Sequence, residues 1–253
     1  MDVIITLAGK SLRFKDNGYK LPKFLLPIGK STVIEQVLNL FDDKDDFHLI
    51  VNKKQLKQNK NLKSYLTNLK KKISIYEIDE HDNGPIYSIL NAKNLSCDKD
   101  IIISYCDLLV SWNYKKFLRL SQGYDASILS FRKFHPSSFT GTLYCYLKTV
   151  KELIVGLREK KSFTKTPSEE YASAGIYYYK SLSQFRYYAE KVLNSKKINK
   201  IFKEYYVSLP YLFLLKENKK ILNFEAENFI SLGTPRDYEK FISWKNYFNK
   251  YEK

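Results

Sequence analysis

The sequence has few of the residues that build disulfide frameworks and metal centres. Its 253 residues include only three cysteines and three histidines. Cys97, Cys106 and Cys145 show no paired spacing, and the histidines lie far apart and form no ligand motif. This pattern excludes a disulfide scaffold and gives no zinc or redox signature, and it fits a reducing compartment.

Long hydrophobic runs, repeats and low-complexity linkers are also missing. No apolar stretch is long enough to span a bilayer, and no signal peptide follows Met1. We therefore expect a cytoplasmic protein without membrane insertion. A hydrophobic content of 44% in 253 residues is ample for one large core. The sequence is interpreted as a single domain over residues 1–253.

Negative charge is scarce relative to positive charge. Lys and Arg number 43 against 27 Asp and Glu, a formal charge of +16. Such an excess is typical of proteins that bind nucleic acid, anionic membranes or phosphorylated small molecules. An AT-rich genome, which favours Lys, Asn, Ile, Phe and Tyr codons, explains it equally well. We find no recognisable basic face or stacking motif, so no specific nucleic-acid partner is expected, and a nucleic-acid-binding protein remains only an alternative.

Short apolar runs alternate with helical patterns along the chain. Strands are predicted at residues 3–7, 47–51, 73–78, 100–107, 124–134 and 221–226. Helices are predicted at residues 32–41, 53–70, 85–93, 114–122, within 181–217, and at 235–249. This alternation predicts a three-layer α/β/α Rossmann-like sandwich with a mostly parallel mixed sheet. Strands within 141–180 predict a small inserted β lobe, which we interpret as the acceptor-binding part of the molecule.

The most informative stretch follows the first predicted strand and reads "LAGKSLRFKDNGYKLPKFLLPIGK" (7–30). Gly9 has no Cβ, so backbone N–H groups there can approach an anion. A Walker A motif needs a glycine five residues before its Gly-Lys pair, where this chain has Ile4 and Phe24. The G-x-G-x-x-G fingerprint fails as well. The loop is a phosphate-binding candidate of another type.

The pattern that fits is that of nucleotidyltransferases that activate phosphorylated sugars and alcohols. Their first strand is followed by "LAGKSLRF" (7–14), "GY" (18–19), "PKFL" (22–25) and "GK" (29–30) in this chain. Further matches, in order, are "YCDLLVSW" (105–112), "LREKKSF" (157–163), "SAGIYYYK" (173–180) and "ISLGTPRDYEKF" (230–241). The ordered set spans nearly the whole chain and resembles this family.

The resemblance implies roles for individual residues. Arg13 and Lys23 are implied as catalytic cations on the triphosphate, with Lys23 at the α-phosphate. The implied nucleotide contacts are Leu7, Ala8, Gly9, Lys10, Ser11, Asn83, Gly84 and Tyr105. Lys160 is implied to hold the acceptor phosphate, with Lys161 as a rival one place away. The implied acceptor contacts beside it are Ser173, Ala174 and Gly175.

A magnesium site is implied as well, with Asp107 at a strand end as its ligand. Many family members carry a second metal-binding aspartate two residues before the closing Gly-Thr pair, where this chain has Ser231. Glu227 and Asp237 are the neighbouring candidates for the second ligand, and the sequence leaves this choice open. The chain also departs from the family at Ser11, which stands in place of a second glycine.

The short chain further resembles small cytidylyltransferases of capsule biosynthesis, including those that act on phosphoglutamine. This resemblance implies CTP as the donor and phosphoglutamine or another phosphorylated capsule precursor as the acceptor. A sugar-1-phosphate uridylyl- or thymidylyltransferase shares every motif and remains an alternative. The sequence leaves monomer and homodimer open.

Overall fold

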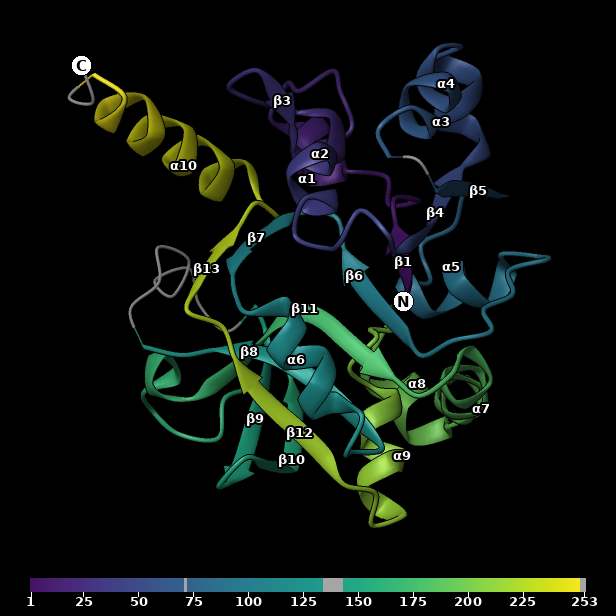
Figure 1. The fold of residues 1–253 in the computed structure, drawn as a ribbon, viewed down its shortest axis with the longest axis vertical. Coiled ribbons are helices and arrows are strands. Elements are labelled where there is room, and N and C mark those ends of the chain that lie inside the picture. Colours follow the sequence, from purple (N-terminus) through teal and green to yellow (C-terminus); the bar gives the residue numbers. More distant parts are fainter. Residues whose placement is uncertain (71, 134–142, 251–253) are drawn as a thin grey trace.

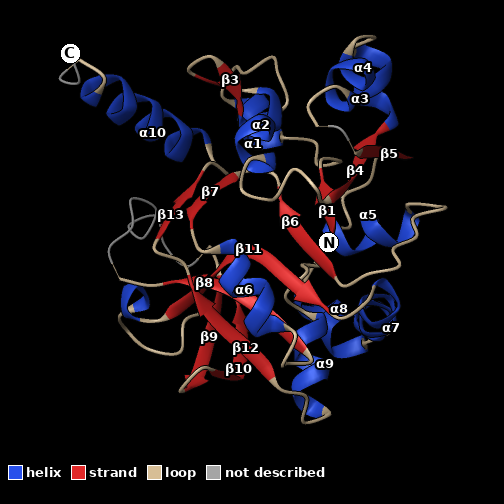
Figure 2. Ribbon diagram, in the orientation of Figure 1, coloured by secondary structure: helices blue, strands red, loops and turns tan. Residues whose placement is uncertain are grey.

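A nine-stranded sheet organises the protein, whose computed structural model describes residues 1–70, 72–133 and 143–250. Its strand order is β5-β4-β1-β6-β11-β8-β12-β10-β9 (Figures 1 and 2). The strands are β1 (Asp2–Thr6), β4 (Asp46–Asn52), β5 (Ile73–Ile78), β6 (Ile101–Tyr105), β8 (Ala126–Phe131), β9 (Cys145–Val150), β10 (Leu153–Glu159), β11 (Tyr171–Tyr179) and β12 (Ile221–Glu225).

One half of the sheet is parallel. β5, β4, β1 and β6 pair in parallel, and so do β8 and β12. Ile5 of β1, for example, lies between Leu49 and Ser104. The carboxyl ends of parallel strands share one edge of a sheet, which brings the loops after β1 and β6 together. The predicted α/β class is confirmed.

The segment predicted as an inserted lobe is continuous with the main sheet. β11 pairs antiparallel with β6 through residues 176–179 and with β8 on its other side. Residues 171 and 172 of β11 pair with β9, which also pairs with β10. β10 also pairs with β12, so β11, β8, β12, β10 and β9 form a closed ring of paired strands. The sheet therefore contains more antiparallel pairing than we expected. The closure sets the β9–β10 hairpin beside the carboxyl end of β6.

Helices cover both faces of the sheet. They are α1 (Leu12–Asp16), α2 (Val33–Leu38), α3 (Lys53–Gln58), α4 (Leu62–Thr67), α5 (Pro85–Asn91), α6 (Tyr114–Ser121), α7 (Leu182–Leu193), α8 (Lys196–Ile201), α9 (Pro210–Lys216) and α10 (Pro235–Phe248), with 3₁₀ turns η1 (Lys23–Leu25) and η3 (Pro167–Glu169). Side chains alternate along β1, so Val3 and Ile5 join one buried cluster and Ile4 the other. The first cluster includes side chains of α2, α4 and α6, and the second those of α5, α7 and α9, which gives the predicted three layers.

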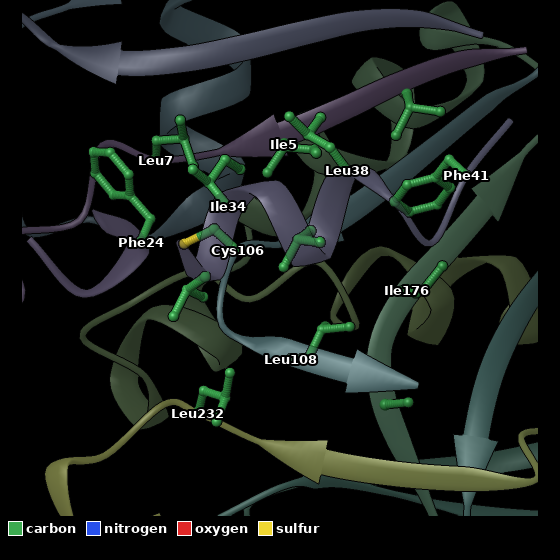
Figure 3. Packing of buried hydrophobic residues seen from close by; sticks show 14 of the residues in the cluster. Ile5, Leu7, Phe24, Ile34, Leu38, Phe41, Cys106, Leu108, Ile176 and Leu232 are labelled. Atoms are coloured by element: carbon green, nitrogen blue, oxygen red, sulfur yellow. The ribbon is translucent and has the colours of Figure 1, made fainter. Parts of the chain in front are cut away.

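The first cluster packs α2 against the sheet. Ile34 and Leu38 of α2 lie over Ile5, and Phe24 lies near Leu7 (Figure 3). Thr32 is the N-cap of α2, with a reciprocal capping box to Glu35. The predicted helix over 32–41 is therefore present but shorter. The helix predicted over 53–70 is interrupted, because residues 59–61 leave the helical conformation between α3 and α4.

Two short pairs of strands were not predicted. β7 (Leu108–Ser111) pairs antiparallel with β13 (Asn228–Ser231), and β2 (Pro27–Ile28) pairs with β3 (Ser31–Thr32). The β7–β13 pair leads into α10, which projects at the upper left of Figure 1. Its packing brings the closing "GTPRDY" segment next to the end of β6. Among the described residues, no helix is long and apolar enough to cross a membrane.

Candidate functional site

A cavity of about 500 Å³ lies where the loops after β1 and β6 meet the turn after β10. Most of the residues selected from the sequence line it. They are Ala8, Gly9, Lys10, Ser11, Arg13, Lys23, Gly84, Tyr105, Asp107 and Lys160. Residues separated by more than 150 positions therefore share one site. Side chains that face it are supplied by the first loop, residues 81–88, the end of β6, the turn after β10 and residues 204–206.

The first loop is shaped by Ser11, which stands where the resembling family has a glycine. Ser11 has φ 54° and ψ 36°, the left-handed conformation that glycine adopts most readily. Its hydroxyl accepts the backbone N–H of Lys23 at 3.2 Å. On the other flank, Gln55 Nε2 donates to the carbonyl of Gly9 at 3.0 Å. The serine thus keeps the loop conformation and ties its start to the segment that carries Lys23.

Lys23 and Asp107 form an ion pair in the cavity wall. The Lys23 ammonium lies 2.6 Å from Asp107 Oδ2, and the two side chains are 25% and 17% exposed. Burial alone would lower the pKa of Lys23, but the charge and hydrogen bond of Asp107 outweigh it and raise this pKa above its ordinary value. The lysine is therefore a fixed cation at neutral pH, held at the carboxyl end of β6.

The surroundings of Asp107 fit a small, hard cation that prefers oxygen ligands. A Cβ on Gly233 would lie 2.9 Å from Asp107 Oδ2 and 3.4 Å from Ser231 Oγ, so glycine leaves room beside both oxygens. The Leu232 N–H donates to the Asp107 carbonyl at 2.7 Å. This hydrogen bond joins the end of β13 to the turn between β6 and β7. Mg²⁺ is usually held by one or two carboxylates with waters and phosphate oxygens. One carboxylate with a neighbouring hydroxyl meets that need.

Neither candidate for the second metal ligand lines the cavity. Glu227 accepts a hydrogen bond from Ser111 at 2.9 Å, at the far end of the β7–β13 pair. Four strand positions separate Ser111 from Asp107, a distance of roughly 13 Å. Asp237 is 5% exposed and accepts from Thr234 at the start of α10. Burial raises its pKa, with Asp107 as a minor contributor. The residue beside Asp107 in space is Ser231.

Lys160 lines the cavity from the turn after β10. It follows β10 with φ 54°, and its backbone N–H donates to the Tyr144 carbonyl at 2.8 Å. Its ammonium lies 4.4 Å from the centre of the Tyr206 ring and donates to the Tyr206 hydroxyl. That hydroxyl contacts Glu204 Oε2 at 3.1 Å. An exposed lysine is thereby held over the cavity by an aromatic ring.

A buried carboxyl group lies beneath Lys160. Glu159 accepts a hydrogen bond from Ser208, and burial raises the pKa of Glu159 above its ordinary value. Burial likewise raises the pKa of Tyr105, whose ring packs edge-on against Tyr177 at 5.8 Å. The Tyr105 hydroxyl accepts the Val207 N–H at 3.3 Å. This layer supports the end of β6 and the 204–208 segment at once.

The "SAG" residues expected at the acceptor lie under the cavity wall instead. Ser173 is 5% exposed and Ala174 is 2% exposed, and neither lines the cavity. Gly175 has φ +86°, and a Cβ there would lie 3.0 Å from Leu108 and from Tyr105. The strand register shifts at this point, so these residues form a bulge that supports Tyr105. Leu7 is also a core residue at 1% exposure.

Among the cavity residues that the sequence did not predict are His81, Glu204 and Tyr206. His81 gave no signal because a single histidine far from the others has no motif. Tyr206 reaches its partner Lys160 only through the tertiary fold, since 46 positions separate them. Lys10 of the first loop pairs with the exposed Asp82 of the 81–88 segment at 2.6 Å, and both residues line the cavity.

Comparison with known proteins gives a consistent result. The Nucleotidyl transferase family matches residues 2–240. A nucleoside-diphosphate-sugar pyrophosphorylase from Vibrio cholerae is 18% identical, with a TM-score of 0.79 over 96% of this chain and 100% of that one. A UTP-bound UGPase from Acinetobacter baumannii is 14% identical, with a TM-score of 0.67 over 96% and 92%.

The inositol-1-phosphate CTP transferase from T. maritima is 12% identical, with a TM-score of 0.65 over 93% of this chain and 90% of that one. Comparison with curated protein sequences finds no significant match. The structural likenesses establish the fold, and the family match covers almost the whole chain. The chain therefore belongs to the Nucleotidyl transferase family, whose members transfer a nucleoside monophosphate onto a phosphorylated sugar or small molecule.

Proposed function

We propose that the protein transfers CMP from CTP onto a phosphorylated small molecule and releases pyrophosphate. The observation that carries this proposal is the arrangement of cations around one cavity. Arg13 and Lys23 line it from the first loop and the η1 turn, and Lys160 lines it from the turn after β10. Two anionic substrates have to meet in such a reaction, and cations from these separate segments reduce their mutual repulsion.

The chemistry is an in-line displacement at phosphorus. An oxygen of the acceptor's phosphate forms a bond to the α-phosphorus, and the bond from that phosphorus to the bridging oxygen breaks. Pyrophosphate leaves with the electron pair. Lys23 stabilises charge at the α-phosphate, Arg13 binds the β- and γ-phosphates through its planar donor fork, and Lys160 orients the acceptor's phosphate. No covalent enzyme intermediate is needed.

Asp107 would hold Mg²⁺, with the Ser231 hydroxyl beside it. When bound, the ion would neutralise phosphate charge. Lys23 pairs with the Asp107 carboxylate at 2.6 Å; with Mg²⁺ on that carboxylate, the Lys23 ammonium would be free to bind phosphate. Neither Glu227 nor Asp237 is required in this proposal.

CTP is proposed as the donor because the chain resembles small cytidylyltransferases of capsule biosynthesis. The T. maritima structure shows that this fold serves a CTP-dependent enzyme. Phosphoglutamine and other phosphorylated capsule precursors are the proposed acceptors. A cytoplasmic location belongs to the same proposal, since Cys97, Cys106 and Cys145 are all free thiols.

A screen for pyrophosphate release tests the proposal. Purified protein with Mg²⁺ receives each of four nucleoside triphosphates together with a panel of phosphorylated amides, alcohols and sugars. The matched control is the Lys23→Ala protein, which distinguishes turnover at this site from a contaminating activity. We expect CTP to give the largest acceptor-dependent release. Turnover with no pair in the panel would contradict the proposal.

A sugar-1-phosphate uridylyl- or thymidylyltransferase is the second candidate. The specific observation in its favour is the likeness to a UTP-bound UGPase from Acinetobacter baumannii and to a sugar pyrophosphorylase from Vibrio cholerae. The same screen separates the two. If this second candidate is correct, UTP or dTTP with a sugar 1-phosphate should give more pyrophosphate release than CTP with any acceptor.

A further inference from the structure

The segment that runs from β5 into α5 forms a wall of the cavity, lined by His81, Asp82, Gly84, Pro85 and Ser88. Asn83 and Gly84, which the family resemblance implies as nucleotide contacts, are taken here as the contacts to the nucleobase. Gly84 has φ +83°, and a Cβ there would lie 2.7 Å from the backbone nitrogen of Tyr205. The Tyr205 N–H donates to the Asn83 carbonyl at 2.9 Å, and the Ile86 N–H donates to the Tyr205 carbonyl at 3.1 Å. Backbone hydrogen bonds thus fix the outer side of this wall.

The inner side is held by His81. The backbone N–H of Asn83 donates to His81 Nδ1 at 3.1 Å, so this nitrogen carries no proton. Nε2 therefore carries the proton and donates to Ser88 Oγ, 3.0 Å away on α5. The Ser88 hydroxyl donates onward to the Gly84 carbonyl at 3.5 Å. One neutral tautomer of the ring links both halves of the wall.

The charge state of the ring follows from its surroundings. Burial is the largest influence and lowers the pKa of His81 below its ordinary value of about 6.5. The Asp82 carboxylate favours the protonated ring, and the Lys10 ammonium opposes it. The Tyr87 ring packs edge-on against the His81 ring at 4.7 Å. His81 is therefore neutral at pH 7 and gains a proton only in mild acid.

We propose that His81 is a positioning residue for the nucleoside triphosphate. Its neutral ring fixes the backbone of Asn83 and Gly84 in the conformation that receives the base, and a proton on Nδ1 releases it. A protonated Nδ1 is a donor and cannot accept the Asn83 N–H. The inference rests on the proposed function, because it takes residues 83 and 84 as the nucleobase contact.

Nucleotide binding without an acceptor tests this directly. Calorimetry with CTP and Mg²⁺ compares about pH 8 with about pH 5, well below the ordinary histidine pKa, because the pKa of His81 is lowered. His81→Asn places an amide oxygen near the position of Nδ1 and does not titrate. We expect wild-type affinity to fall by about two- to tenfold more than that of His81→Asn between the two pH values, the size of one lost hydrogen bond. Titration of CTP itself is common to both proteins.

Two further variants complete the design. His81→Leu removes the acceptor altogether, and we expect weak binding at both pH values. His48→Gln is the control, since His48 contacts Asp2 at 2.8 Å, outside the cavity lining, and should keep the wild-type pH dependence. Thermal melts show whether each variant is folded.

The outcomes separate the two levels of the argument. Equal pH dependence in wild type and His81→Asn, or tight binding by folded His81→Leu at about pH 8, would overturn the role of His81 while nucleotide binding stands. If wild type binds no nucleoside triphosphate at either pH, the proposed function fails, and the role of His81 fails with it.

Discussion

Two lysines from distant parts of the chain line the same cavity, and they are held in different ways. Lys23 is only 25% exposed and pairs with a carboxylate from the end of β6. Lys160 is exposed, follows a hairpin, and rests on the ring of Tyr206. The Lys23 side is built on the parallel half of the sheet, where the geometry is set by packed strands. The Lys160 side is built on connections, which tolerate change more easily. We infer that chemistry common to the family belongs to the first side and acceptor choice to the second.

Replacing Lys23 should have the largest effect. Lys23→Ala removes the cation proposed to meet charge that develops in transfer, so turnover should fall by about 10²- to 10³-fold. The Lys53–Asp79 pair, at 2.9 Å, is a surface equivalent outside the cavity. Lys53→Ala should leave turnover nearly unchanged. Steady-state rates and thermal melts of both variants check this, and a larger loss in Lys53→Ala would reverse the assignment.

Arg13→Ala should also lower turnover by about 10²- to 10³-fold. Arg13 is exposed on α1 and lines the cavity, so its loss should change the free energy of unfolding by only about 0.5 kcal/mol. The prediction is a large defect in rate with an almost unchanged melting curve. A comparable loss of both would show a structural role instead.

Asp107→Asn should reduce turnover through metal affinity. The amide keeps the size of the side chain but loses the hard anionic ligand, so raising the Mg²⁺ concentration should recover part of the rate. The Lys23→Ala defect should not respond to Mg²⁺ in this way. Asp79→Asn is the matched control. Rates measured across a Mg²⁺ series give the answer, and a defect in Asp107→Asn that is independent of Mg²⁺ would count against a metal role.

Tyr206→Phe should have a smaller effect confined to the acceptor. The ring under Lys160 remains, but the hydroxyl contact is lost, so KM for the acceptor should rise by about two- to tenfold with little change in KM for CTP. The control is Tyr187→Phe, where Lys191 lies 4.2 Å from the ring centre on α7. A selective rise in KM for CTP in Tyr206→Phe would contradict the assignment of this residue to the acceptor.

The smallest expected effect concerns nucleic acid. A charge of +16 should give weak binding that falls steeply with salt, because it comes from counterion release and not from a shaped site. Fluorescence anisotropy with single- and double-stranded oligonucleotides at two salt concentrations tests this. Nanomolar, sequence-selective binding at physiological salt would show that the cavity is not the main site.

More of the residues predicted to contact the donor line the cavity than of those predicted to contact the acceptor. Residues 7–25 place Gly9, Arg13 and Lys23 in one short stretch, so local motif and loop conformation largely determine them. The α/β class and most strands followed from apolar runs. The Lys160–Tyr206 contact and the His81 hydrogen bonds join segments through the tertiary fold. The burial of Ser173 could not be read from its motif either, because it depends on a strand register set by three neighbours.

The position of β11 has a consequence for how the chain acquires its structure. β11 lies between β6 and β8, both of which are synthesised before it. Until residues 171–179 leave the ribosome, β6 and β8 each keep an unpaired, apolar edge, and the two halves of the sheet are not joined. Fragments that end before residue 171 should therefore aggregate. The cavity therefore cannot form before a strand that contributes no side chain to its lining.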